Sequence, residues 1–178
     1  GAAAIVFRGR TRMSYPSVMI TGLPVSSMHR FDYAGSDYGA YHRLSDSARE
    51  KIRAHTLTFG KWASELGYKG LFGVDFVVHN GEPYALELNP RLLGTSQLMT
   101  ELELHENPGP PTISWHLAEL LGAGVQDDET KPELERIGTS SLHGFQLLLR
   151  NTRPHRVRIQ SAVKPGIYTL PGETPVFI

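Results

Sequence analysis

The sequence predicts an α+β fold: an antiparallel sheet with a long helix packed on one face, and a small β-rich lobe towards the carboxyl end. Three observations lead to this expectation. Apolar residues recur every three or four positions over residues 45–66, the dipeptide Asn80-Gly81 joins two apolar runs, and short strand-like runs follow residue 141. A helical period, a hairpin signal and a succession of short strands indicate helix and antiparallel sheet in separate segments.

The composition is that of an ordinary globular chain. Its 178 residues are 40% hydrophobic and 20% charged, which is enough for one core and a small appended lobe. Lys plus Arg and Asp plus Glu are balanced at 18 each, so charge predicts no binding to nucleic acid or to an anionic membrane. The absence of cysteine excludes disulfides, thiolate metal sites and a Cys nucleophile. With no membrane span or signal-peptide pattern, we expect a cytoplasmic protein.

The amino-terminal residues predict two short strands, at 4–7 and 17–20, because both runs are apolar. The polar stretch 8–16 is interpreted as the connection between them. Residues 23–44 contain two glycines and four aromatic residues, and we interpret them as a structured surface loop. A substrate lid is the alternative for this loop.

The stretch 45–66 predicts an amphipathic helix of roughly five turns. Ser45 and Asp46 offer an N-cap, and Gly67 is suited to the carboxyl-terminal end. The period of the pattern is not two, which excludes a strand. The expected core positions of this helix are Ala48, Ile52, Phe59, Trp62, Ala63 and Leu66.

Residues 71–78 and 83–88 predict the two strands of a hairpin. A short helix follows, capped at Thr95-Ser96 and running through Leu104. The composition changes at the Pro- and Gly-rich stretch 107–111. We therefore expect one domain over residues 1–106 and an extension over residues 107–178.

The extension predicts a helix from Thr112 to about Gly122, followed by a polar and acidic stretch at 126–136. Three further runs have strand-like patterns and indicate a small β-rich lobe. These runs cover residues 142–150, 156–163 and 166–170.

Three oxygen-bearing side chains fall on the predicted hairpin: Asp75 on its first strand, and Glu87 and Asn89 on its second. Glu87 and Asn89 are two apart, so both point to the same face of the sheet. Two carboxylates and an amide carbonyl are ligands suited to Mg²⁺. The alternative is a solvated outer face with ordinary salt bridges, and spacing alone leaves the two readings about even.

The number of residues in the turn decides whether Asp75 points to the same face of the sheet as Glu87 and Asn89. A strict two-residue Asn-Gly turn would pair Asp75 with Leu86, on the opposite face from Glu87. A three-residue turn over residues 79–81, with its glycine in the left-handed region, places Asp75 opposite Ala85 and diagonal to Glu87. We therefore predict the three-residue turn.

Arg91 lies two residues beyond Asn89 and follows Pro90, which ends the strand. A planar guanidinium suits anionic oxygens of phosphate or carboxylate, so Arg91 is a candidate catalytic residue. A surface Arg in an ordinary ion pair is the alternative.

The motifs around these residues resemble the carboxyl-terminal core of the ATP-grasp superfamily, which includes D-alanine–D-alanine ligase, biotin carboxylase and carbamoyl phosphate synthetase. The resemblance is carried by Gly67-Tyr68-Lys69-Gly70, by Gly73-Val74-Asp75-Phe76 and by Leu86-Glu87-Leu88-Asn89-Pro90-Arg91. Five features match in order: the helix, the glycine-flanked tyrosine, the acidic strand, the turn and the Glu-x-Asn-x-Arg end. The match is strongest over residues 45–104.

The resemblance implies a function and a set of ligands. Asp75, Glu87 and Asn89 are similar to the residues that hold Mg²⁺ or Mn²⁺ with ATP, and Arg91 to the arginine that holds the substrate carboxylate or the transition state. The implied reaction is ATP-dependent ligation of a small-molecule carboxylate to an amine through an acyl phosphate. Metal ions and arginine would neutralise the transferring phosphoryl group.

The sequence departs from the family in length. Nothing before Gly1 corresponds to the amino-terminal lobe with phosphate-binding lysines, so we expect that lobe to be supplied in cis or in trans and the chain alone to be inactive. The alternative function is a non-catalytic or partner-dependent half-domain that binds another chain. Separately, a homo-oligomer is among the expected assemblies. A metal-dependent hydrolase is a third class, but no nucleophile motif supports it.

Overall fold

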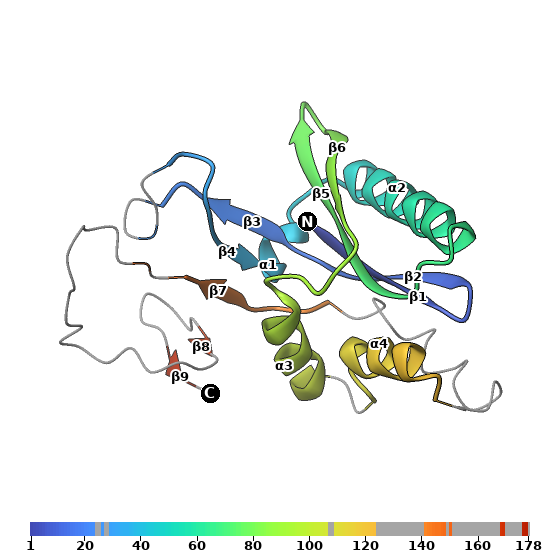
Figure 1. Ribbon diagram of the computed structural model, residues 1–178. Coiled ribbons are helices and arrows are strands. Elements are labelled where there is room, and N and C mark those ends of the chain that lie inside the picture. Colours follow the sequence, from blue (N-terminus) through green and yellow to red (C-terminus); the bar gives the residue numbers. More distant parts are fainter. Residues whose placement is uncertain are drawn as a thin grey trace.

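The computed structural model describes residues 1–23, 26, 29–106, 109–123, 141–148, 150, 168–169 and 176–177. Antiparallel sheets and packed helices confirm the expected mixed α and β architecture (Figure 1). The main sheet has four strands, in the spatial order β2 (Arg10–Pro16), β1 (Ala2–Phe7), β5 (Gly70–His79) and β6 (Glu82–Asn89). A short separate pair is formed by β8 (Tyr168–Thr169) and β9 (Val176–Phe177).

The amino-terminal hairpin corrects the expectation for residues 8–16. Most of this stretch is strand β2, which pairs antiparallel with β1. The chain reverses in a two-residue turn in which Arg8 and Gly9 have φ values of 48° and 74°. Two successive left-handed residues suit the right-handed twist of a hairpin. The sequence concealed this turn because arginine seldom adopts a positive φ.

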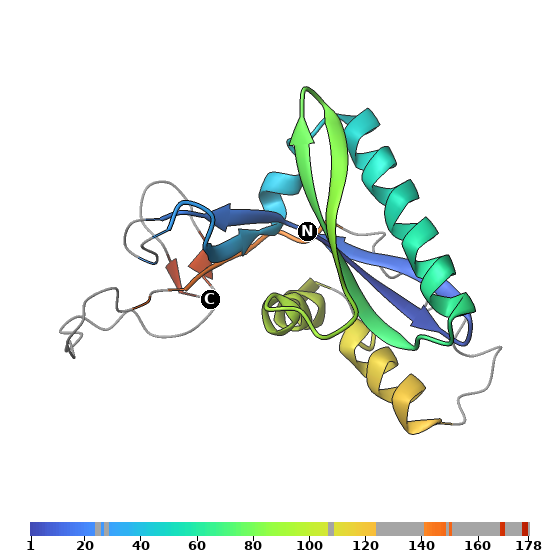
Figure 2. The same cartoon turned by 45° about the horizontal axis from the view of Figure 1, so that its top comes forward.

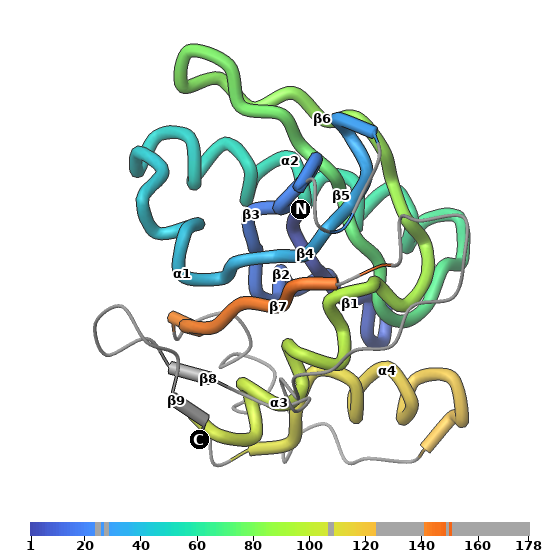
Figure 3. The backbone as a smooth tube through the Cα atoms, turned by 90° about the vertical axis from the view of Figure 1, so that its left-hand side faces the viewer, coloured from blue at the N-terminus to red at the C-terminus, as the bar shows by residue number. Residues whose placement is uncertain are grey.

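A second sheet is formed by β3 (Val18–Thr21), β4 (Tyr33–Asp37) and β7 (Phe145–Leu147). The expected loop over 23–44 is therefore wrong in its second half, which holds β4 and the short helix α1 (Tyr38–Tyr41). Strand β7 lies in the range expected for a carboxyl-terminal lobe, but it runs beside β4 (Figure 3).

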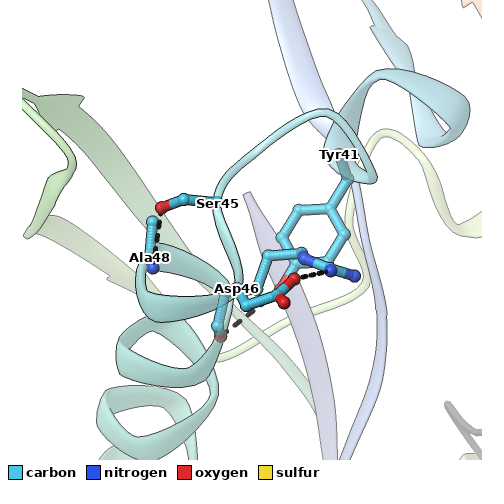
Figure 4. A network of polar contacts seen from close by, with 5 residues as sticks. Tyr41, Ser45, Asp46 and Ala48 are labelled. Carbon is cyan, nitrogen blue, oxygen red and sulfur yellow. Dashed lines mark hydrogen bonds and ion pairs between the residues drawn. The ribbon is translucent and has the colours of Figure 1, made fainter.

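The long helix α2 (Asp46–Glu65) confirms the periodicity argument. The Ser45 side chain accepts a hydrogen bond from the backbone N–H of Ala48, 3.2 Å away (Figure 4). Arg49 forms an ion pair with Asp46, and the Tyr41 hydroxyl donates a hydrogen bond to the Arg49 carbonyl. These contacts fix the first turn of the helix, where backbone N–H groups lack helical partners.

The buried face of α2 differs in part from the expected one. Trp62 and Leu66 are 52% and 68% exposed, so neither is a core residue. The positions that face the sheet are mostly small, because the helix lies close to it: a Cβ on Gly60 would lie 2.1 Å from Thr11 Cγ2. The buried positions of α2 are Ala48, Ile52, Thr56, Gly60 and Ala63.

Helices cover both faces of the main sheet (Figure 2). On β1, Ala4 and Val6 point to the α2 side, where Phe59 packs against their cluster. Ile5 and Phe7 point to the other side and pack against Trp115. Trp115 belongs to α4 (Thr112–Leu121), and α3 (Ser96–Glu106) lies beside α4. The fully buried β1 thus divides the core into two layers.

Both helices after the hairpin were expected from the sequence, as was the end of α4 at the left-handed Gly122. The predicted polar stretch 126–136 and the predicted strand 156–163 lie outside the described residues, as does most of 166–170. Within the described part of the chain, no helix is long and apolar enough to cross a membrane.

Candidate metal and nucleotide site

The hairpin of β5 and β6 turns tightly at Asn80 and Gly81, which have φ values of 51° and 80°. His79 pairs directly with Glu82, so the turn has two residues and the predicted three-residue turn is wrong. Asn-Gly is the preferred dipeptide for a turn with two left-handed residues. By itself this turn would have paired Asp75 with Leu86.

A β-bulge in β6 brings Asp75 to the same face of the sheet as Glu87. Phe76 pairs with Ala85, but Asp75 pairs with Glu87, so Leu86 is the extra residue on β6. Residues directly opposite each other in an antiparallel pair share a face. Asp75 and Glu87 therefore point to the same side of the sheet, and Asn89 joins them two residues further along.

This side is the one that lies away from α2. Phe72 and Val74 of β5 pack in the α2-side cluster, and Asp75 alternates with them. Glu87 is exposed, Asp75 is half-buried and Asn89 is 6% exposed. The three expected ligands thus extend from solvent into a partly enclosed space.

Hydrogen bonds link three of the four expected site residues. Asn89 Nδ2 donates to Asp75 Oδ2 over 3.2 Å, and Arg91 Nη2 donates to Asn89 Oδ1 over 3.1 Å. Arg91 also donates from Nη1 to the Leu92 carbonyl over 3.1 Å. Asn89 turns its nitrogen to Asp75, so a rotation of the amide would bring its oxygen to a cation held there.

A pocket of ≈ 280 Å³ opens beside these residues. Asp75, Asn89 and Arg91 line one wall, while Glu87 lies outside it. The small residues Ala2, Ala3 and Gly73 also line the pocket, and a Cβ on Gly73 would meet Leu93 Cδ2 at 2.5 Å. This volume lies just below the range of about 300–1,000 Å³ that is usual for ligand pockets.

The second sheet supplies the facing wall, which sequence patterns did not predict. Met19 from β3, and Tyr33 and Ser36 from β4, line the same pocket. Tyr33 was assigned to a loop because glycines and aromatics without a clear period surround it. Sequence reasoning could have found this wall only by predicting a strand over residues 33–37.

The chemistry of the donor set fits a hard divalent cation. Two carboxylates that face each other across a strand pair repel, and a cation between them removes that cost. Oxygen donors from Asp, Glu and an amide are the ones Mg²⁺ takes while keeping several waters. No cluster of three or more acidic, His or Cys ligands occurs among the described residues, so the third protein ligand would be the amide.

A comparison with known protein families supports the resemblance to the ATP-grasp superfamily. Residues 18–95 match the family model of an ATP-grasp domain. The matched range includes the hairpin, the bulge and all four expected site residues, and it agrees with the resemblance seen in the motifs. Residues 18–95 of this chain are therefore similar to an ATP-grasp domain.

Proposed function

We propose that this chain provides the metal-binding part of a ligase that joins a small carboxylic acid to an amine through an acyl phosphate. An ATP-grasp domain indicates an ATP-dependent, ligase-type function. The observation that supports the finer proposal is the bulged hairpin, which pairs Asp75 with Glu87 and connects Asp75 through Asn89 to Arg91. The pocket beside them offers space for the acid.

Each of the four site residues has its own role in the proposed reaction. Asp75 and Glu87 hold the magnesium of MgATP, with the amide oxygen of Asn89 as a further ligand. Bound MgATP supplies the electrophilic γ-phosphoryl group. Arg91 orients the carboxylate of the acid and neutralises charge on the transferring group.

The proposed ligation has two steps, and the bonds made and broken balance in each. A carboxylate oxygen attacks the γ-phosphorus and ADP leaves, which forms an acyl phosphate on the acid. The amine then attacks the acyl carbon, inorganic phosphate leaves with its bonding electron pair, and the proton lost by the amine goes to the released phosphate. The protein's contribution is positioning and charge neutralisation, as in other phosphoryl transfers.

The test is calorimetric titration of the chain with Mn²⁺ and with MgATP. Glu87→Gln should weaken metal binding by at least about tenfold, because one charged ligand is lost. In metal-free buffer the same variant should gain about 0.5 kcal/mol of unfolding free energy, since a like-charge pair is removed. Opposite signs in the two measurements are diagnostic of a cation site.

Glu82→Gln is the matched control, because Glu82 lies on the same strand and forms an ion pair with Lys51 of α2. It should leave metal affinity unchanged. Equal Mn²⁺ affinity of the wild type, Asp75→Asn and Glu87→Gln would refute the metal site. Hydroxylamine trapping of the acyl phosphate, with the chain alone and mixed with an ATP-grasp amino-terminal lobe, separates a ligase from a non-catalytic half-domain.

A further inference from the structure

The facing wall of the pocket is built by a second bulge. In the pairing of β3 with β4, Ile20 lies opposite Gly35 but Thr21 lies opposite Tyr33, so Ala34 is an extra residue. Tyr33 and Ser36 are three apart and would face opposite sides of a regular strand. The bulge brings them to one side, and the Tyr33 hydroxyl lies 3.0 Å from Ser36 Oγ.

Gln146 of β7 fixes the direction of the hydrogen bonds at this wall. Its Nε2 atom lies 3.1 Å from the Gly94 carbonyl oxygen and 2.8 Å from the Tyr33 hydroxyl. A carbonyl oxygen only accepts, so the atom facing Gly94 must be the amide nitrogen. The same nitrogen donates to Tyr33, whose oxygen is therefore an acceptor.

Ser36 supplies a second hydrogen bond to the same oxygen. Ser36 is 0% exposed, and within the described part of the chain its hydroxyl has Tyr33 as its hydrogen-bond partner. A buried hydroxyl hydrogen without an acceptor is costly, so Ser36 donates and Tyr33 accepts. Tyr33 thus accepts from two donors, and its own hydrogen is left for a group in the pocket that it lines. Accepting two hydrogen bonds also strengthens Tyr33 as a donor.

The pocket therefore presents a donor from each of its two walls. Arg91 offers guanidinium N–H groups on the hairpin side, and Tyr33 offers a phenolic O–H on the side of the second sheet. Ala2, Ala3 and Gly73 also line the pocket and offer no side-chain hydrogen bond, whereas Tyr15, Ser17 and Thr95 line it with hydroxyl groups. A ligand that satisfies both walls carries an acceptor at two separated positions.

We propose that the acid bound here carries a second acceptor group, as a small dicarboxylate or an oxo acid does, and that Tyr33 is the residue that selects it. This proposal rests on the proposed ligase function. The first carboxylate lies at Arg91 beside the metal ligands and is the one activated. The second acceptor receives the Tyr33 hydrogen, and Gln146 and Ser36 act as positioning residues for Tyr33.

The experiment measures selectivity by calorimetric titration of the full 178-residue chain. Malonate, succinate and glutarate are compared with propionate, butyrate and valerate, so each diacid has a monoacid of equal chain length. For the diacid that binds most tightly, we expect the affinity to exceed that of its monoacid by at least about tenfold, as for one hydrogen bond to a charged group. Equal affinities in all three pairs would overturn the proposal.

The variant Tyr33→Phe removes one oxygen and leaves the ring in place. We expect the diacid-to-monoacid ratio to fall towards one, with a thermal unfolding curve that confirms a folded protein. Tyr84→Phe is the matched control, because Tyr84 lies on β6 outside the pocket and is 54% exposed. A ratio that persists in Tyr33→Phe, or falls equally in Tyr84→Phe, would overturn the role of Tyr33.

The two proposals fail in different ways. Loss of the diacid preference with intact Mn²⁺ binding that depends on Glu87 refutes the selectivity role and leaves the ligase site standing. A diacid preference that depends on Tyr33, without any Mn²⁺ binding, refutes the metal site but retains the acid pocket.

Discussion

At the residue scale, His116 of α4 is joined to the main sheet by one hydrogen bond. The backbone N–H of Leu71 donates to His116 Nδ1 over 2.9 Å. Gly70 makes this approach possible, because its φ is 95° and a Cβ there would lie 2.3 Å from Nδ1. An accepting Nδ1 requires the neutral ring, and burial lowers the pKa of His116.

The pKa shift of His116 predicts a loss of stability in acid. A lowered folded-state pKa means that the unfolded chain binds the proton more tightly, so stability is full above about pH 6.5 and falls as the pH drops below it. Urea unfolding at pH 7 and pH 5 should show a larger loss for the wild type than for His116→Gln, which keeps an uncharged acceptor. Burial also lowers the pKa of His42, which is present in both proteins and cancels in the difference. Equal losses would contradict the prediction.

Single residues also show what sequence can and cannot reveal about the site. Asp75, Glu87, Asn89 and Arg91 were recognisable because strand alternation and a motif place them within 17 positions of one another. Tyr33 was not, because its role depends on pairing with strands far away in sequence. Its partner Gln146 lies 113 residues further on, and no local pattern links the two.

At the scale of elements, the hairpin shows that the length of its turn and the position of its register shift are two separate features. The sequence pattern alone does not distinguish them. Alternation predicted its strands, and the requirement for a common face predicted a one-residue shift. The shift was assigned to the turn, but the structure has it at Leu86. Turn and bulge displace the ladder by the same amount, so the pattern of side chains does not distinguish them. The cap of α2 and the end of α4 were predictable because each depends on neighbouring residues.

This geometry predicts the outcome of two deletions in one strand. Removing Leu86 should abolish the bulge and keep Asp75 opposite Glu87. The pairing that the turn sets would then continue without a shift to the open end of the hairpin. Removing Leu88 should move Asn89 opposite Val74 and turn it towards α2. Mn²⁺ titration should therefore show binding retained in the Leu86 deletion and weakened by at least about tenfold in the Leu88 deletion. Equal losses in the two would show that the bulge itself shapes the site.

At the scale of the whole molecule, the packing of α2 on the main sheet depends on close approach. A Cβ on Gly60 would lie 2.1 Å from Thr11 Cγ2 and 2.9 Å from Phe72 Cζ. Gly60 therefore sets the spacing between the helix and the sheet layer that carries Asp75 on its other side.

Gly60→Ala should lower the unfolding free energy by up to about 2 kcal/mol. Alanine improves helix propensity by about 1 kcal/mol, but overpacking a filled interface costs about 1–3 kcal/mol. Thr58→Ala is the control, at an exposed position of the same helix, and should change stability by less than about 0.5 kcal/mol. Urea denaturation measures both, and a stabilised Gly60→Ala variant would show that the helix can move outward at little cost.

The pairing of β7 with β4 has one wider consequence. Gln146 donates a hydrogen bond to Tyr33, a residue of the pocket lining, from outside residues 18–95, the range that matches the ATP-grasp domain. Under the selectivity proposal, Tyr33 lies inside the matched range, whereas the residue that positions it lies outside. On that proposal, substitutions at residue 146 would change the choice of acid while every residue of the matched range stays the same.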